Sequence, residues 1–90
     1  PKPGRRRSRL AELLARGEAF VVYESPHRIQ KLLSDLTDLD PECRVLAGRE
    51  MTKAFEEYMA GTPGEVRSAL ESREKVQGEF SVLVYGGKNA

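Results

Sequence analysis

The order of apolar patterns along the chain constrains its fold most strongly. Apolar residues recur at helical spacing in three segments, and short apolar runs typical of strands lie in four others. The helical segments are about 7–16, 25–36 and 62–70, and the strand segments are about 19–24, 44–49, 55–60 and 79–85. The order helix, strand, helix, strand, strand, helix, strand predicts an α/β chain, with a mixed sheet of about four strands and three helices.

Local signals set several boundaries of these elements. Ser25-Pro26 predicts the start of the second helix, because serine caps helices and proline is tolerated in their first turn. Thr62 and Glu65 have the spacing of a capping box for the third helix. The short link between the second and third strands predicts an antiparallel hairpin. The continuous apolar run at 19–24 predicts a strand that is covered on both faces.

The chain of 90 residues has the length of one small domain, or of one lobe of a larger protein. We expect residues 1–6 to form a basic linker and residues 86–90 a flexible tail. Cys43 is the only cysteine, so no internal disulfide can form, which fits a reducing compartment. The sequence has no apolar run of roughly 18 residues and no signal-peptide pattern, and we expect a cytoplasmic protein.

Ionisable residues gather where two of the predicted strands end. They are Glu24, His27 and Arg28 after the first strand, and Arg49, Glu50 and Lys53 after the second. The first two strands and the helix between them read as a βαβ unit, whose strands are parallel. Ligands bind at the carboxyl ends of such strands, so we expect one polar cluster at that edge. The alternative is a surface decoration, in which the carboxylates simply pair with the arginines.

Other kinds of site have weaker support in the sequence. His27 is the only histidine and no cysteine pair occurs, so we expect no metal site. Adjacent residues in a strand point to opposite faces, so Glu56 and Glu57 do not form a catalytic carboxylate pair.

Arg5, Arg6, Arg7 and Arg9 lie close together with no acidic residue among them, in a chain of net charge +1. Blocks of like charge are usually solvated surface. A block that precedes an amphipathic helix also suits a phosphate backbone. No aromatic residue interrupts the run, so it does not indicate base stacking.

Four segments together resemble one known family. "YESPHR" (23–28), "GREMTKAFEE" (48–57), "GT" (61–62) and "GEFSVLV" (78–84) resemble, in order and spacing, the C-terminal half of the ribosomal RNA small-subunit methyltransferase I family. That family belongs to the tetrapyrrole-methylase superfamily, and the resemblance extends from about Pro1 to Tyr85. Relatives that methylate porphyrin-like substrates lack this pairing of ESPHR with RE-TK. Met51 stands where leucine is commoner, and Phe55 where histidine is frequent, so we expect no chemistry at position 55.

The resemblance implies a function and an organisation. The family transfers a methyl group from S-adenosylmethionine to a ribose 2′-hydroxyl of a cytidine in 16S rRNA, in the small ribosomal subunit. Its members are cytoplasmic homodimers with two lobes, and the cofactor lies between the lobes. The glycine-rich cofactor loop belongs to the N-terminal lobe, and nothing similar occurs in this sequence. The chain is therefore expected to be the second lobe, which is inactive alone and binds neither membrane nor metal.

The reaction assigns provisional roles to the candidate residues. Methyl transfer to a ribose hydroxyl is chiefly a positioning task, and cations must hold the flanking phosphates. Arg28, Arg49, His27 and the four arginines of the N-terminal run are expected to bind substrate. Glu24 and Glu50 are expected to order the cations or to contact the ribose. Lys53 acts as a base only if burial lowers its pKa.

Two other functions fit the same sequence. One is a non-catalytic RNA-binding or dimerisation module, and the other is a lobe of a precorrin-type tetrapyrrole methylase. A glycine-rich strand-loop-helix segment upstream of Pro1 would favour the enzyme, and an unrelated domain there would favour the module.

Overall fold

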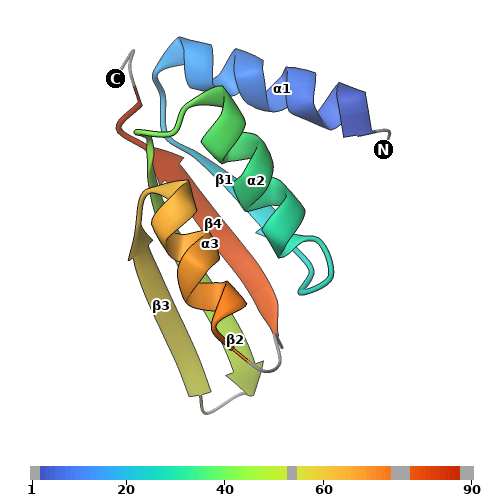
Figure 1. The fold of residues 1–90 in the computed structure, drawn as a ribbon, viewed down its shortest axis with the longest axis vertical. Helices are drawn as coiled ribbons and strands as arrows, with labels where there is room; N and C mark the ends of the chain where they lie inside the picture. The colour runs from blue at the N-terminus through green and yellow to red at the C-terminus, as the bar shows by residue number, and fades with distance from the viewer. Residues whose placement is uncertain (1–2, 53–54, 74–77, 88–90) are drawn as a thin grey trace.

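A computed structural model describes residues 3–52, 55–73 and 78–87 of the chain. Helices and strands follow one another in the predicted order (Figure 1). The elements are α1 Pro3–Arg16, β1 Phe20–Glu24, α2 Ile29–Leu39, β2 Arg44–Thr52, β3 Phe55–Gly61, α3 Pro63–Glu71 and β4 Glu79–Tyr85. The α/β class with three helices and four strands is confirmed.

The sheet has the strand order β1-β4-β2-β3, and every neighbouring pair is antiparallel. The β2–β3 hairpin is therefore confirmed, whereas the mixed sheet is wrong. β1 and β2 do run in the same direction, but β4 lies between them and pairs with both. The physical reason is that β4 buries Phe80, Val82 and Val84, which suits a central strand.

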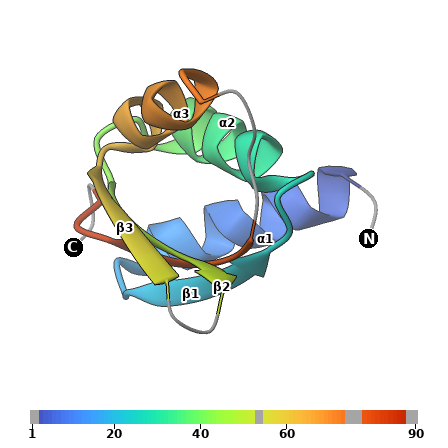
Figure 2. The ribbon, with the colours of Figure 1, turned by 90° about the horizontal axis from the view of Figure 1, so that it is seen from below.

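Helices α2 and α3 cover one face of the sheet, and α1 lies next to α2 on the β1 side of the molecule (Figures 1 and 2). The core fills the space between this helix layer and the sheet. Its buried residues are Leu10, Ile29, Leu32, Leu33, Leu36, Cys43, Val45, Ala47, Val66, Leu70, Phe80, Val82 and Val84. No helix of the described residues covers the opposite face of the sheet (Figure 2).

Strand β1 is covered on one face only, which corrects the expectation from its apolar run. Glu24 is buried on the helix side, whereas Val21 and Tyr23 remain 51% and 79% exposed on the other side. β1 is also an edge strand, because it pairs with β4 alone.

Two predicted helix starts were displaced. α1 begins at Pro3, so residues 3–6 of the predicted basic linker are helical. α2 begins at Ile29, and residues 25–28 form a turn in which the backbone N–H groups of Arg28 and Ile29 donate to the Ser25 carbonyl, each at 3.1 Å. Arg28, rather than Ser25, occupies the N-cap position of α2.

The start of α3 follows the prediction. The Glu65 backbone N–H donates to the Thr62 hydroxyl at 3.2 Å, and the Thr62 N–H donates to the Glu65 carboxylate at 2.9 Å. This is the expected capping box. Of the predicted tail, Gly86 and Gly87 follow β4 outside any helix or strand, and residues 88–90 lie outside the described residues.

Candidate functional site

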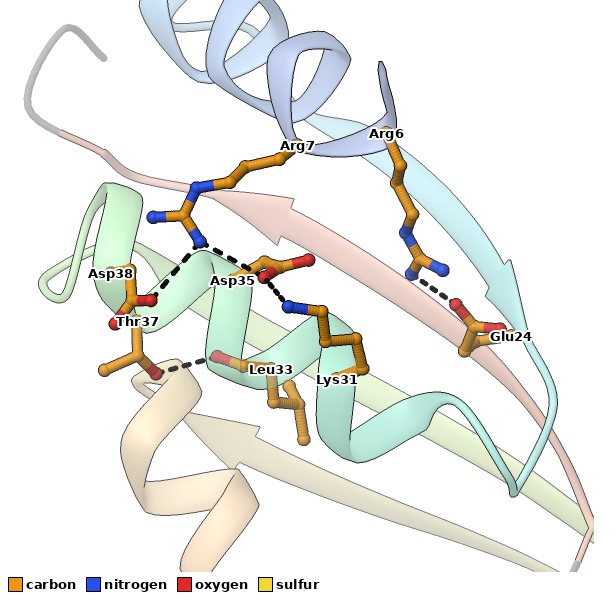
Figure 3. Close-up of polar contacts among 8 residues, drawn as sticks. All are labelled: Arg6, Arg7, Glu24, Lys31, Leu33, Asp35, Thr37 and Asp38. Carbon is orange, nitrogen blue, oxygen red and sulfur yellow. Dashed lines mark hydrogen bonds and ion pairs between the residues drawn. The ribbon is translucent and has the colours of Figure 1, made fainter. Parts of the chain in front are cut away.

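Glu24 ends β1 and joins it to α1. Its side chain points toward the helices and is 6% exposed, and it forms an ion pair with Arg6 of α1 (Figure 3). The backbone N–H of Ser25 donates to the same carboxylate at 3.1 Å. A carboxylate in such a position needs these partners, because burying an unpaired charge is costly. Glu24 therefore fixes the N-terminal part of α1 beside the end of β1.

Arg7 joins α1 to α2 through acidic residues. Its guanidinium lies 3.2 Å from Asp35 and 3.3 Å from Asp38, and Lys31 also pairs with Asp35 at 2.9 Å (Figure 3). The Asp35 side chain is only 2% exposed, so two cations compensate for its burial. The sequence holds a signal of this contact, since Asp35 falls among the leucines of the buried face of α2.

The arginine run thus divides into two pairs with different surroundings. Arg6 and Arg7 pair with carboxylates of other elements and hold α1 against β1 and α2. Arg5 and Arg9 are exposed, and Arg9 pairs with Glu12 of the same helix at 3.1 Å, with both side chains more than half exposed. Such a surface pair is weak, so Arg5 and Arg9 present their charge to the solvent.

A groove of about 480 Å³ opens between α1, β1 and the turn before α2. Arg28 reaches it from the turn, and His27 lies exposed next to Arg28. The groove is lined by Arg5, Arg6, Arg9, Leu10, Leu13, Val22, Tyr23, Glu24 and Arg28. It combines four arginines with one carboxylate that is already paired with Arg6, so its field attracts anions.

Arg49 is buried and belongs to a separate, partly buried cluster. Its guanidinium donates to Glu57 at 2.6 Å and lies 6.0 Å from the centre of the Phe80 ring. Arg73 binds the same carboxylate with two hydrogen bonds of 2.7 Å. These hydrogen bonds from Arg73, together with the charges of both arginines, hold the pKa of Glu57 below its usual value. Arg49, which the sequence analysis expects to bind substrate, is 4% exposed.

Among the described residues, the two faces of the sheet divide members of the predicted cluster of six. Glu24 and Arg49 share one cross-strand row, but Phe80 of β4 lies between them. Glu50 follows Arg49 in β2 and is exposed on the opposite face of the sheet. The insertion of β4 and the alternation along β2 thus separate Glu24 from Glu50. Lys53, the third predicted catalytic residue, lies outside the described residues.

Other chemistries find little support in the described part of the chain. Burial, with the nearby Asp40 charge, raises the pKa of the Cys43 thiol to about 11, so this cysteine is not a nucleophile near neutral pH. Within residues 3–52, 55–73 and 78–87, no three His, Cys, Asp or Glu side chains gather as metal ligands. None of the helices in these ranges is long and apolar enough to cross a membrane.

Several known proteins with one shared name are similar in sequence to this chain. No family model matches the chain. It is 48% identical over 86 residues to the ribosomal RNA small subunit methyltransferase I of Borrelia garinii subsp. bavariensis, covering 93% of this chain and 38% of the relative. Proteins of the same name from Coprothermobacter proteolyticus and Neisseria meningitidis serogroup B are 42% and 38% identical. These matches cover 93% and 94% of this chain, but 36% and 30% of the relatives.

The chain therefore spans about a third of the length of the curated relatives it matches. The similarity nevertheless extends over 93% of this chain. The chain is thus a homologue of the proteins named ribosomal RNA small subunit methyltransferase I, at 32–48% identity.

Proposed function

We propose that the chain is the second lobe of an enzyme that transfers a methyl group from S-adenosylmethionine to a ribose 2′-hydroxyl of a cytidine in 16S rRNA. The observation that carries the proposal is the similarity to relatives named ribosomal RNA small subunit methyltransferase I over 93% of the chain. The four-arginine groove supports it, because an enzyme that acts on RNA needs a surface that attracts phosphates. The proposed partners are the small ribosomal subunit and a second copy of the protein, in the cytoplasm.

Within the groove, Arg5 and Arg9 of α1 and Arg28 of the turn are the proposed phosphate contacts. All three are exposed, and they reach the groove from two different elements. Arg6 and Glu24 have a different proposed role, since their ion pair fixes the wall of the groove. Phosphate contacts set the register and orientation of a nucleic acid without reading its sequence. The chain would thus contribute positioning, which is a large part of what an in-line methyl transfer requires.

The groove suits a phosphate better than it suits the cofactor. S-adenosylmethionine supplies the methyl group from a sulfonium centre, which is itself a cation. Four arginines repel such a centre, and the carboxylate of the groove is already paired with Arg6. We therefore place the cofactor against the other lobe and expect the 90-residue chain alone to be inactive. Calorimetric titration should then show no saturable binding of S-adenosylmethionine to this chain.

A methylation assay tests the proposed function. The whole protein is incubated with methyl-labelled S-adenosylmethionine and unmethylated small ribosomal subunits, and the rRNA nucleosides are analysed by mass spectrometry. The expected product is 2′-O-methylcytidine, and Arg28→Ala should slow its formation, whereas Arg16→Ala, on the same helix as the run but outside the groove lining, should not. Methylation of a base, or the absence of any methylated nucleoside, would contradict the proposal. The same assay with Lys53→Ala tests the predicted base.

A further inference from the structure

The helix-free face of the sheet carries two cross-strand rows that complement each other in size. One row is made of Val21, Leu83, Leu46 and Ala60, from β1, β4, β2 and β3. The next row is made of Tyr23, Ser81, Gly48 and Tyr58, in the same strand order. Each strand therefore contributes a larger side chain to one row and a smaller side chain to the other row. Val21, Tyr23 and Tyr58 are 51%, 79% and 65% exposed, so the face presents apolar and aromatic surface to the solvent.

The two ends of this face carry opposite charges. At one end, the register places Glu50 directly beside both Glu79 and Glu56, and all three are exposed. Like charges in such cross-strand positions are destabilising. At the other end, Arg44 is exposed beside Tyr85. Along β2, Arg44 and Glu50 lie the same number of residues before and after Ala47.

We infer that this face binds the same face of a second copy of the chain, about a two-fold axis that runs across the strands at the level of Ala47. Such an axis keeps each strand opposite its own copy and exchanges the two ends of the sheet. Leu46 then faces Gly48 of the partner subunit, and Leu83 faces Ser81 of the partner subunit. Arg44 faces Glu50 of the partner subunit, so each acidic end meets a basic end.

The shape of the face fits this arrangement. A hollow of about 150 Å³ lies at Gly48 and Ser81, beside the Tyr58 ring and the three glutamates. A Cβ atom at position 48 would lie 3.1 Å from that ring, so any larger residue would crowd the hollow. Leu46 and Leu83 of a second copy supply apolar side chains that this hollow receives. Tyrosine is enriched in the buried cores of protein interfaces. The position of Tyr58 beside the hollow agrees with this preference.

The charges also argue against nucleic acid as the occupant of this face. A row of three glutamates repels phosphates, and the basic groove lies at the α1 side of β1. In the proposed dimer, each copy instead places its Arg44 against the row of glutamates of the other copy. The inference specifies a surface for the proposed dimer and does not depend on the proposed methyl transfer.

Analytical ultracentrifugation of the whole protein tests the inference through a charge exchange. Arg44→Glu and Glu50→Arg should each weaken dimerisation by at least about tenfold, because each change places like charges together twice in a symmetric dimer. The double variant R44E/E50R should restore the dimer, since opposite charges then face each other again. Leu46→Asp should leave a monomer at concentrations where the unaltered protein is dimeric. Arg16→Glu and Glu42→Arg, which change exposed charges elsewhere, are the matched controls.

Several results would overturn the inference. They are a monomeric unaltered protein, single variants that dimerise normally, and a double variant that is as weak as either single variant. If another part of the same polypeptide covers this face, the variants will change the stability but leave the association constant unchanged, which also overturns it. If Leu46→Asp fails to fold, the variants of the exposed residues Arg44 and Glu50 still test the inference. Methylation is measured separately, so its failure would leave this test unaffected.

Discussion

At the scale of single residues, the face on which a side chain lies decides what its charge can do. Arg49 and Glu50 are neighbours in β2, yet one is buried among the helix-side residues and the other is exposed on the opposite face. The alternation along a strand could be predicted from the sequence, as it was for Glu56 and Glu57. The pairing of Glu57 with Arg49 and Arg73 could not, because it depends on where α3 packs.

Glu57→Gln tests this partly buried cluster through the pH dependence of stability. The change should lower the free energy of unfolding at pH 7 by about 1 kcal/mol, because hydrogen bonds to a charged partner are weakened. The folded-state pKa of Glu57 is lowered, so its contribution is present above the unfolded pKa of about 4.3 and is lost as the pH falls through the folded value. Urea unfolding between pH 7 and pH 3 should therefore show the two proteins converging at low pH.

The matched control is Glu56→Gln, which alters the exposed neighbour on the other face of β3. It should change the stability by less than about 0.5 kcal/mol at any pH in this range. A loss for Glu57→Gln that stays constant from pH 7 to pH 3 would mean that the carboxylate charge is not what stabilises the cluster.

At the scale of elements, local signals predicted most of the helices and strands, and tertiary contacts decided the rest. The capping box of α3 was predictable, because both of its residues lie within one turn. The first turn of α1 was not, since proline, glycine and three arginines read as a linker. In the structure these residues are helical, and Arg6 and Arg7 pair with carboxylates of β1 and α2. Such long-range contacts cannot be predicted from a local sequence pattern.

Arg7→Met tests the contact between α1 and α2. The change leaves the buried Asp35 carboxylate without one of its two cations, so we expect a loss of about 1–3 kcal/mol in the free energy of unfolding. Arg9→Met is the control, because its exposed pair with Glu12 should contribute less than about 0.5 kcal/mol. Both values are obtained by urea unfolding. Equal losses in the two variants would show that Arg7 is not a tertiary contact.

Gly78→Ala tests the backbone conformation immediately before β4. Gly78 has a φ of 83°, and a Cβ atom there would lie 2.2 Å from the Glu50 carbonyl oxygen. Alanine should therefore cost at least about 1–2 kcal/mol in the free energy of unfolding. Gly64→Ala is the control, since its Cβ in α3 would meet nothing within 4 Å and alanine favours the helix. A Gly78→Ala protein as stable as the parent would contradict this account of Gly78.

At the scale of the whole molecule, the composition and order of elements predicted the class but not the strand order. The last strand, β4, inserts between β1 and β2, and this long-range pairing separates residues that a simple βαβ unit would bring together. The surroundings of the ESPHR motif could not be predicted, because they depend on this pairing. The groove forms from the N-terminal helix, the end of β1 and the turn before α2.

The salt dependence of RNA binding tests most directly the central claim that this groove holds rRNA phosphates. The whole protein and its triple variant Arg5→Ala, Arg9→Ala, Arg28→Ala are titrated with a 16S rRNA fragment over a range of salt concentrations. We predict that the slope of log K against log salt falls by up to about 0.7–0.9 for each lost contact. A control variant with Arg16→Ala and Arg67→Ala, two arginines outside the groove lining, should keep the original slope. An unchanged slope in the triple variant would contradict the account and leave the groove as solvated surface.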